Sequence, residues 1–183
     1  MNISKFTQKS VEILNNLEKI AYDFGAQEIA QEHLLYGMLT VEDSLIKKLI
    51  EKMEIDSDVF LAQVEGAVRK RPQVQGGQVY IGQDLNKVLV YAENEAKALG
   101  DEYVSVEHLF LSLLRKPSKE IKQLFHDFQI DRERFLQALS KVRGNQKVTT
   151  DNPEAVYDSL NKYGYDLVER AREKKLDPVI GRD

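Results

Sequence analysis

The chain repeats itself at an offset of 75 residues. Shifting the 183-residue sequence by 75 positions aligns Gly25 with Gly100 and Glu32-His33-Leu34 with Glu107-His108-Leu109, and no gap is needed. The same shift pairs further positions: Leu14 with Leu89, Ala21 with Ala96, Ile46 with Ile121, Leu49 with Leu124, Ile55-Asp56 with Ile130-Asp131 and Phe60-Leu61 with Phe135-Leu136. Because helix ends, helix starts and core positions recur together, the sequence predicts two copies of one folding unit.

Each copy has the residue spacing of a helical protein. Apolar residues recur at intervals of three and four, which indicates amphipathic helices. We expect four helices in each copy: residues 7–24 and 82–99, a second beginning near 32 and 107, a third over 44–53 and 119–128, and a fourth over 58–69 and 133–143. Strand-like alternation is confined to a short stretch at 79–81. The predicted fold class is all-α, with two tandem four-helix repeats in a pseudo-twofold relation.

Several residues are suited to begin or end these helices. Gly25 and Gly100 each follow a first helix, where glycine readily adopts the left-handed conformation that ends it. Asp56 and Asp131 precede the last helix of each copy and can accept hydrogen bonds from its free backbone N–H groups. Ser105 can cap the second helix of the second copy in the same way.

Composition shifts divide the chain into segments. Residues 71–80 contain Pro72, Gly76 and Gly77, which predicts a surface loop between the repeats. We place repeat one at about 6–72 and repeat two at about 81–146, which together make one domain over 1–146. Residues 147–154 are then a polar linker. A separate helical segment over 155–183 follows Asn152-Pro153, with apolar positions at Val156, Leu160, Tyr163 and Leu167.

The composition excludes several classes of protein. The net charge is −4, from 26 basic and 30 acidic residues, so no overall field would attract nucleic acid or an anionic membrane. The sequence has no cysteine for disulfides or thiolate metal sites. We expect no signal peptide and no membrane span, because residues 1–9 lack a basic segment followed by an apolar run and no window approaches about 20 apolar residues. We expect a soluble cytoplasmic protein without nucleic-acid or membrane partners.

The histidines and glutamates of the repeated motif are the candidates for chemistry. Neighbouring residues on a helix point about 100° apart, so Glu32-His33 and Glu107-His108 do not converge as the two histidines of His-Glu-x-x-His do. We interpret His33 and His108 as buried, hydrogen-bonded structural residues, with a zinc site or a small enzyme as the alternative. Glu32 and Glu107 either offset the helix dipole or bind the amides or guanidinium group of a ligand.

Other motifs do not indicate a catalytic site. Gly76, Gly77 and Gly82 lack the Gly-Lys-Ser or Gly-Lys-Thr of a phosphate-binding loop. The basic run at 69–71 suits the negative end of a helix dipole. The sequence specifies no Ser-His-Asp triad. We therefore assign no catalytic residue and no metal site.

The repeated motifs resemble a known family. Phe6-Thr7, Gly25, Glu32-His33-Leu34-Leu35, Gly100 and Glu107-His108-Leu109 are similar to the Clp amino-terminal domain, found in the ClpA, ClpB and ClpC unfoldases. Residues 71–76 and Gln83-Asp84-Leu85 resemble the ClpB pattern. Residues 175–183 resemble the entry into the first AAA+ module of ClpB, which implies that 155–183 is the truncated start of that module. The resemblance covers essentially the whole chain.

The resemblance implies a function that composition does not. Members of the ClpB subfamily form ATP-driven hexamers that extract polypeptides from aggregates together with the DnaK chaperone system. The resemblance implies that the ATPase motifs and the coiled-coil middle domain lie beyond Asp183. This chain would then need no cofactor, while the full-length protein would bind ATP and Mg²⁺. The chain itself would be a monomeric, non-catalytic module that contacts unfolded or aggregated polypeptides first.

The resemblance also implies site residues. Thr7, Asp101 and Glu107 match family positions implicated in substrate contact, and an apolar groove between the two long helices is expected to use Leu14, Val88, Tyr91 and Leu109. Ala30-Gln31 departs from the Thr or Pro common in relatives, which leaves the start of the second helix of repeat one open. The alternative function is docking of an adaptor or of phosphoarginine, as in ClpC relatives, with Glu32 as a second ligand site.

Overall fold

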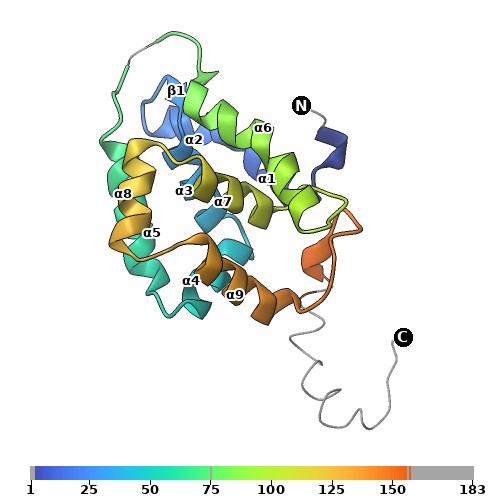
Figure 1. Ribbon diagram of the computed structural model, residues 1–183. Coiled ribbons are helices and arrows are strands. Elements are labelled where there is room, and N and C mark those ends of the chain that lie inside the picture. Colours follow the sequence, from blue (N-terminus) through green and yellow to red (C-terminus); the bar gives the residue numbers. More distant parts are fainter. Residues whose placement is uncertain (1–2, 75, 156, 158–183) are drawn as a thin grey trace, which may run out of the picture.

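The computed structural model describes residues 3–74, 76–155 and 157 and is mainly helical (Figure 1). Repeat one contains a 3-10 helix (Ile3–Lys5) and the helices α1 (Gln8–Asn15), α2 (Leu17–Asp23), α3 (Gln31–Thr40), α4 (Leu45–Lys52) and α5 (Ser57–Arg69). Repeat two contains α6 (Gln83–Ala98), α7 (Val106–Arg115), α8 (Lys119–Asp127) and α9 (Arg132–Arg143). The all-α prediction and its helix order are confirmed, with most bounds within two residues.

The first helix of repeat one is interrupted, which the sequence did not predict. Instead of one helix over 7–24, α1 ends at Asn15 and α2 begins at Leu17. The backbone N–H of Asn16 donates to the carbonyl of Ile13 at 3.1 Å, which tightens the turn there. The equivalent helix of repeat two, α6, is continuous.

Backbone contacts recur at the 75-residue offset. Gly25 and Gly100 have φ of +70° and +73°, and the N–H of each donates at 3.0 Å to the carbonyl three residues earlier. Asp56 and Asp131 accept from backbone N–H groups at the starts of α5 and α9, as predicted. The two repeats therefore share the same capping contacts as well as the same residues.

The repeats exchange their leading segments. The strand β2 (Tyr80–Ile81), which precedes α6, pairs in parallel with β1 (Glu28–Ile29) of repeat one. Conversely, Phe6, which precedes α1, forms a parallel bridge with Val104 of repeat two. At the repeat offset, Phe6 corresponds to Ile81 and Val104 to Ile29, so one pairing is the pseudo-twofold copy of the other. The same symmetry holds for the bonds from Thr7 N to Val104 O and from Gly82 N to Ile29 O, both 2.9 Å.

The second helix of each repeat lies in the middle of the molecule (Figure 1). Helix α3 contacts helices of both repeats, as does α7. Their apolar side chains belong to one continuous buried cluster, in which Leu34 and Leu109 are completely buried. Packing across the repeats includes an edge-to-face contact of Phe60 with Phe128, with ring centroids 5.0 Å apart. The repeats thus form one core instead of two small domains.

The residues Ala30-Gln31, which differ from the family pattern, stand at the start of α3, where Gln31 bonds to repeat two. Ala30 has no side-chain oxygen to cap the helix, but its backbone N–H donates to Nδ1 of His33 at 2.8 Å, as that of Ser105 does to His108 in repeat two. The buried amide of Gln31 reaches into repeat two. It donates to the carbonyls of Asp84 and Lys116 and accepts from the N–H of Ser118, at 2.8–2.9 Å.

The segment after α9 packs against the domain. Val148, Pro153 and Tyr157 are buried, so the part of the expected linker and C-terminal segment that the structure describes covers the surface of the repeats. In Figure 1 this segment runs beside the N-terminal part of the chain, and Gln8 N donates to Asp151 O at 2.7 Å. The predicted helical positions Val156, Leu160, Tyr163 and Leu167 lie outside the described residues.

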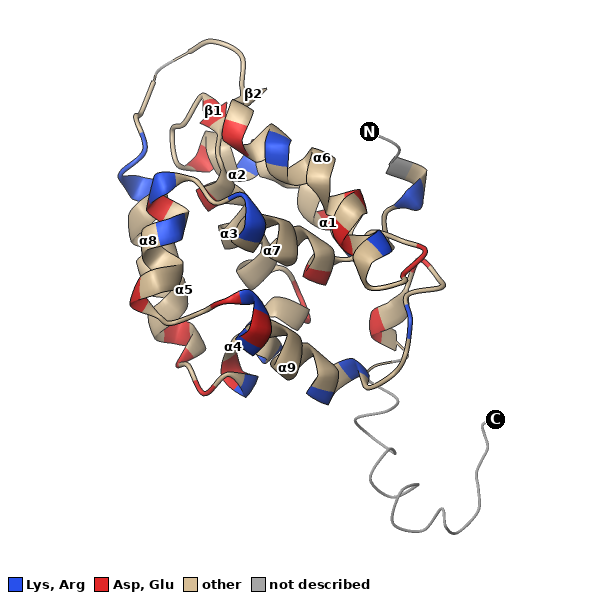
Figure 2. Cartoon of the chain, viewed as in Figure 1, with Lys and Arg blue, Asp and Glu red and all other residues tan. Residues whose placement is uncertain are grey.

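The surface has mixed charge. Figure 2 shows lysine and arginine interspersed with aspartate and glutamate over both repeats, in line with the small net charge. Across the described ranges, no helix is both long and apolar enough to cross a membrane.

Candidate functional site

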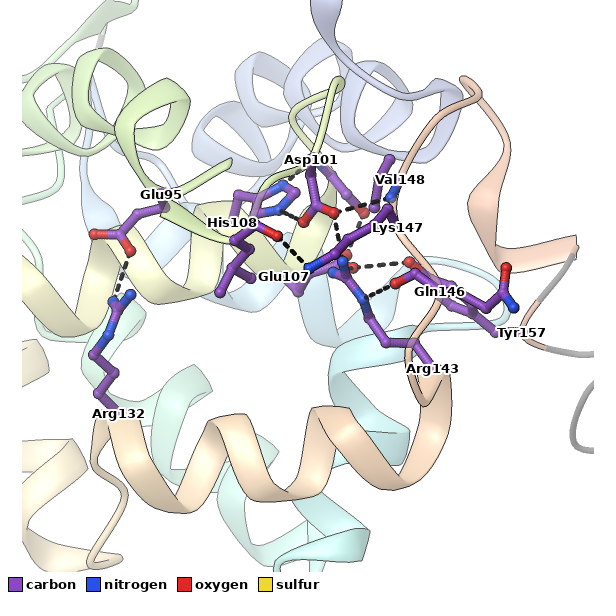
Figure 3. Close-up of polar contacts among 12 residues, drawn as sticks. Glu95, Asp101, Glu107, His108, Arg132, Arg143, Gln146, Lys147, Val148 and Tyr157 are labelled. Carbon is purple, nitrogen blue, oxygen red and sulfur yellow. Dashed lines mark hydrogen bonds and ion pairs between the residues drawn. The ribbon is translucent and has the colours of Figure 1, made fainter. Parts of the chain in front are cut away.

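A buried cluster of charged side chains lies where α6 meets α7 (Figure 3). Gly100 turns the chain at the end of α6, so Asp101 enters the protein directly after it. The carboxylate of Asp101 contacts Nε2 of His108 at 2.6 Å and accepts from the backbone N–H of Val148 at 2.9 Å. Both Asp101 and His108 are buried, so these contacts form away from water.

The N-terminus of α7 supplies the second carboxylate. Ser105 occupies the predicted cap position, but its hydroxyl group donates to Oε1 of Glu107. The backbone N–H of Ser105 donates to Nδ1 of His108 at 2.8 Å. Because Nδ1 accepts this bond, the neutral His108 ring carries its proton on Nε2, facing Asp101. The structural role predicted for this histidine is confirmed.

Arg143 joins the two carboxylates. Its guanidinium group extends from the end of α9 and donates to Oδ1 of Asp101 and, at 3.0 Å, to Oε2 of Glu107. Its Nε donates to the carbonyl of Gln146 at 2.9 Å. Tyr157 completes the cluster, since its hydroxyl group donates to Oε2 of Glu107 at 3.1 Å. Helices α6, α7 and α9 and the following segment are therefore linked through one arginine.

The cluster holds its charges in place. Burial raises the pKa of the Asp101 carboxyl, but hydrogen bonds from His108 and Arg143 outweigh this effect and bring the pKa down to about 2. Burial lowers the pKa of Arg143, but its bonds to the carboxylates raise it further. Burial and the charge of Glu107 raise the pKa of Tyr157. At neutral pH the Asp101 carboxylate therefore faces the Arg143 guanidinium group, and the phenol of Tyr157 stays neutral.

The cluster is arranged for structure instead of acid–base chemistry. Both oxygens of each carboxylate are hydrogen-bonded within the protein, and neither is open to a ligand. Within the part of the chain that the structure describes, no three histidine, aspartate or glutamate side chains are grouped to hold a metal ion. The cluster therefore holds the start of α7 and the segment after α9 in place.

Repeat one lacks this network. Ala26 stands at the position of Asp101 and Val68 at the position of Arg143. His33 keeps the equivalent bond from Ala30, but its buried Nε2 has no hydrogen-bond partner among the described residues. Burial lowers the pKa of His33 to about 4 and raises that of Glu32. Glu32 lies 3.9 Å from Arg71, and its buried Oε1 likewise has no partner within the described ranges.

The structure buries all three predicted contact residues, and Arg143 joins two of them, Asp101 and Glu107. Thr7 caps α1 by accepting from the N–H of Ser10 at 3.3 Å, and its own N–H bonds Val104 near Asp101. The segment 148–157 lies against Thr7's neighbour Gln8 as well as Asp101 and Glu107. A role for these residues in substrate contact stays a prediction, and in this conformation they face the interior.

The predicted groove residues separate into core and surface. Val88 and Leu109 are completely buried and belong to the core, which corrects their expected place in an open groove. Leu14 is partly buried, and Tyr91 is exposed with its ring 4.9 Å from Nζ of Lys116. Val90, which the sequence analysis did not single out, is 54% exposed beside Tyr91 on α6.

Arg143 and Tyr157 were also missed. Sequence comparison of the repeats contained a signal for the arginine, because Asp101 and Arg143 replace the apolar residues Ala26 and Val68 together. An aspartate and an arginine that appear together at two core positions indicate a buried ion pair, because a charge is buried at low cost only beside an opposite charge. No comparable signal exists for Tyr157, which lies outside both repeats.

Comparison with known proteins agrees with this architecture. Residues 5–128 match the model of the Clp repeat (R) N-terminal domain. The chaperone protein ClpB of Nitratidesulfovibrio vulgaris is 45% identical over 100% of this chain, and that of Bacillus cereus is 40% identical, also over 100%. The chain spans 22% of the length of each of these relatives.

Solved structures with low sequence identity share the fold. The Hsp104 N-terminal domain of Candida albicans has a TM-score of 0.70 at 20% identity, covering 80% of this chain and 97% of that one. A ClpV N-domain in complex with a VipB peptide has a TM-score of 0.62 at 20% identity, covering 75% and 86%. From its tandem repeats and these matches, the chain belongs to the Clp repeat N-terminal domain family, with ClpB chaperones among its relatives.

Proposed function

We propose that this chain is the substrate-recognition domain of an ATP-dependent protein disaggregase. It binds exposed apolar segments of misfolded or aggregated polypeptides and catalyses no reaction itself. The identity to ClpB chaperones over the whole chain supports this assignment. In the full-length protein, a cytoplasmic hexamer, ATP and Mg²⁺ would bind to the AAA+ modules, and the DnaK system would act through parts outside this chain.

The observation that carries the proposal is the exposure of two apolar side chains on α6, Val90 and Tyr91. Val90 is 54% and Tyr91 is 37% exposed, so adjacent apolar side chains project from a helix whose other exposed positions are mainly polar. Neighbouring residues on a helix point about 100° apart, so Val90 and Tyr91 expose two apolar side chains along the free surface of α6, where each can contact an apolar segment of a partner. Low affinity and little sequence preference are expected, because the contact uses area instead of directed hydrogen bonds.

The buried contact residues fit this proposal through movement of the C-terminal segment. Val148 and Tyr157 bond to Asp101 and Glu107, and Asp151 bonds to Gln8 next to Thr7, so a polypeptide could reach these three buried residues only after the segment separates from the repeats. Separation would break the bond of Tyr157 to Glu107 and that of Val148 to Asp101. We therefore place the first contact at Val90 and Tyr91.

Fluorescence anisotropy with a labelled, permanently unfolded model protein tests the proposal. The double variant Val90→Ser/Tyr91→Ser should weaken binding at least tenfold, since two partly exposed apolar side chains contribute on the order of 1 kcal/mol each. Val59→Ser is the matched control, because Val59 is 49% exposed on α5. Equal affinities of the two variants would contradict the placement, and no binding by the unaltered chain would contradict the function.

Docking of an adaptor or of phosphoarginine is the second candidate. It is favoured by Glu32, whose buried Oε1 has no hydrogen-bond partner among the described residues. A guanidinium group could form a charge-assisted bond there after Arg71 moves away. Calorimetry with free phosphoarginine decides: heat that disappears in Glu32→Gln supports this candidate, and no heat at millimolar ligand removes it.

A further inference from the structure

A cleft with an apolar floor and a basic rim lies between α7, α8 and α9. Its volume is about 330 Å³, at the lower end of the range for ligand pockets. The apolar part is formed by Leu114, Pro117, Phe125 and Ile130, and the basic part by Arg115, Lys122, His126 and Arg132. The lining also includes Asp131, whose carboxylate accepts from the N–H of Arg134 at the start of α9.

A buried carboxylate fixes two of the basic side chains. Glu95 of α6 is 1% exposed, and it accepts from Nε of Arg115 and, at 2.6 Å, from Nη1 of Arg132. Figure 3 shows Arg132 reaching from α9 to Glu95. Burial raises the pKa of Glu95, but the two arginines outweigh this effect and lower it, so the anion is the stable form. The guanidinium groups are thus held at the cleft before any ligand binds.

The rim retains unused donors. Each arginine uses one nitrogen for Glu95, and its other N–H groups make no hydrogen bond within the described residues. The side chain of Arg115 is 50% exposed, so its donors are accessible. Lys122 is exposed and likewise has no ion-pair partner in the described part of the chain. An arriving carboxylate would therefore find N–H donors that are not already occupied.

One wall of the cleft is fixed from repeat one. Pro117 lies between Lys116 and Ser118, and Gln31 bonds to the carbonyl of the former and the N–H of the latter, at 2.9 and 2.8 Å. The loop that joins α7 to α8 is thus held on both sides of the proline. A preformed wall reduces the entropy that binding would otherwise lose.

Repeat one has no matching basic rim. At the 75-residue offset, Ile20 stands at the position of Glu95, Thr40 at that of Arg115 and Ser57 at that of Arg132. Lys122 corresponds to Lys47, whereas His126 corresponds to Glu51. The buried carboxylate and both arginines therefore occur together in repeat two alone. Helix packing does not require them, because repeat one builds the same helices without them.

We propose that this cleft is a second docking site for a partner protein segment with a large apolar side chain flanked by aspartate or glutamate. The apolar side chain would lie on Phe125, Ile130 and Leu114, and the flanking carboxylates would bind Arg115, Lys122 and Arg132. Charge complementarity selects acidic over basic segments. The cleft is lined by residues of α7, α8 and α9, whereas Val90 and Tyr91 belong to α6. The cleft is therefore separate from the contact site of the proposed function.

Binding of short capped peptides tests the proposal. The probe has a central phenylalanine-leucine pair with two aspartates on each side, and the comparison peptide has lysines in place of the aspartates. With the unaltered 183-residue chain at low salt, the acidic peptide should bind at least tenfold more tightly, and 0.5 M salt should weaken it. Equal binding of both peptides, or none at millimolar concentration, would overturn the proposal.

Matched variants localise the binding. Lys122→Glu should weaken the acidic peptide about tenfold, because it replaces attraction with repulsion at the rim. Lys47→Glu, at the equivalent position of repeat one, should leave the affinity within about twofold. Equal effects of the two variants would overturn the proposal. The variant Val90→Ser/Tyr91→Ser should retain acidic-peptide binding, so failure of this site and failure of the proposed function are distinguishable.

Discussion

The hydroxyl group of Tyr157 donates a hydrogen bond to the buried carboxylate of Glu107, at 3.1 Å and fifty residues away in the sequence. Glu107 belongs to the repeated Glu-His motif, whereas Tyr157 follows both repeats. The bond therefore attaches the segment after α9 to the start of α7. Because Arg143 shares the same carboxylate oxygen, the attachment is part of the charged cluster and not a separate surface contact.

Removing this hydroxyl group should cost about 1–2 kcal/mol. In Tyr157→Phe the ring still fills its buried site, but Glu107 loses one hydrogen bond. Tyr157→Ala should cost about 3–5 kcal/mol, since it also leaves a cavity. Urea unfolding checks both values. Tyr22→Phe is the control, because Tyr22 is largely exposed and its replacement should change nothing measurable.

Replacement of Arg143 should be among the most destabilising single changes. Arg143→Met leaves Asp101 and Glu107 buried without a counter-ion, which costs about 3–5 kcal/mol. Arg69→Met is the matched control, since the pair of Arg69 with Glu65 is exposed and contributes about 0–1 kcal/mol. Similar unfolding midpoints for the two variants would show that the cluster does not stabilise the fold.

Stability should fall as the pH decreases from about 6.5 to 4. Burial lowers the pKa of His33 from 6.5 to about 4, so the unfolded chain takes up a proton in this range before the folded protein does. The expected loss between pH 7 and pH 5 is about 2 kcal/mol. Glu32, whose raised pKa acts in the opposite direction, reduces the net slope.

Variants isolate the contribution of His33. Urea unfolding of His33→Gln at both pH values should show a smaller pH dependence than the unaltered protein, whatever its absolute stability. His126→Gln, which removes an exposed histidine, should keep the full slope. An unchanged slope in His33→Gln would rule out His33 as its source.

Protonation of Asp101 should lower the free energy of unfolding below about pH 4. The pKa of Asp101 is about 2 in the folded protein and 3.8 as its ordinary value. Its contribution is present above pH 4 and is lost as the pH falls through about 2, with a total of about 2 kcal/mol. When the free energy of unfolding is measured between pH 4 and pH 2, Asp101→Asn should remove this decrease in stability. An unchanged decrease in the Asp101→Asn variant would show that other carboxyl groups cause it.

Two glycine-to-alanine changes should have opposite signs. Gly25 has φ of +70°, so Gly25→Ala should destabilise the protein by about 1–2 kcal/mol. Gly66 lies inside α5 with open space around it, so Gly66→Ala should stabilise by about 0.5–1 kcal/mol. Thermal unfolding of the pair checks this, and the same sign for both would contradict the assigned conformations.

The repeat made much of the fold predictable. The offset located the helices and the caps at Asp56 and Asp131, because these depend on local residue spacing. The interruption at Asn16 was not predictable, since its apolar spacing is that of an uninterrupted helix. The alternation at 79–81 indicated β2, but β1 and its pairing with β2 were not predictable, because the two residues of β1 leave no periodic pattern.

The site was predictable only in part. The family resemblance selected Asp101 and Glu107, but burial by residues 148–157 depends on contacts between distant segments. Val88 and Tyr91 have similar apolar character in the sequence, yet one packs into the core and the other is exposed. The informative signal was a difference between the repeats. A charge in one copy opposite an apolar residue in the other, as at Glu95 and Ile20, marks positions where repeat two makes polar contacts that repeat one lacks.

An NMR titration of the isotope-labelled chain with a permanently unfolded model protein tests the central claim most directly. The account predicts that amide signals of Val90, Tyr91 and their neighbours on α6 shift first, and that those of Asp101 and Glu107 follow only if the segment 148–157 separates. Shifts confined to α5 and α4, with α6 unchanged at millimolar ligand, would contradict it.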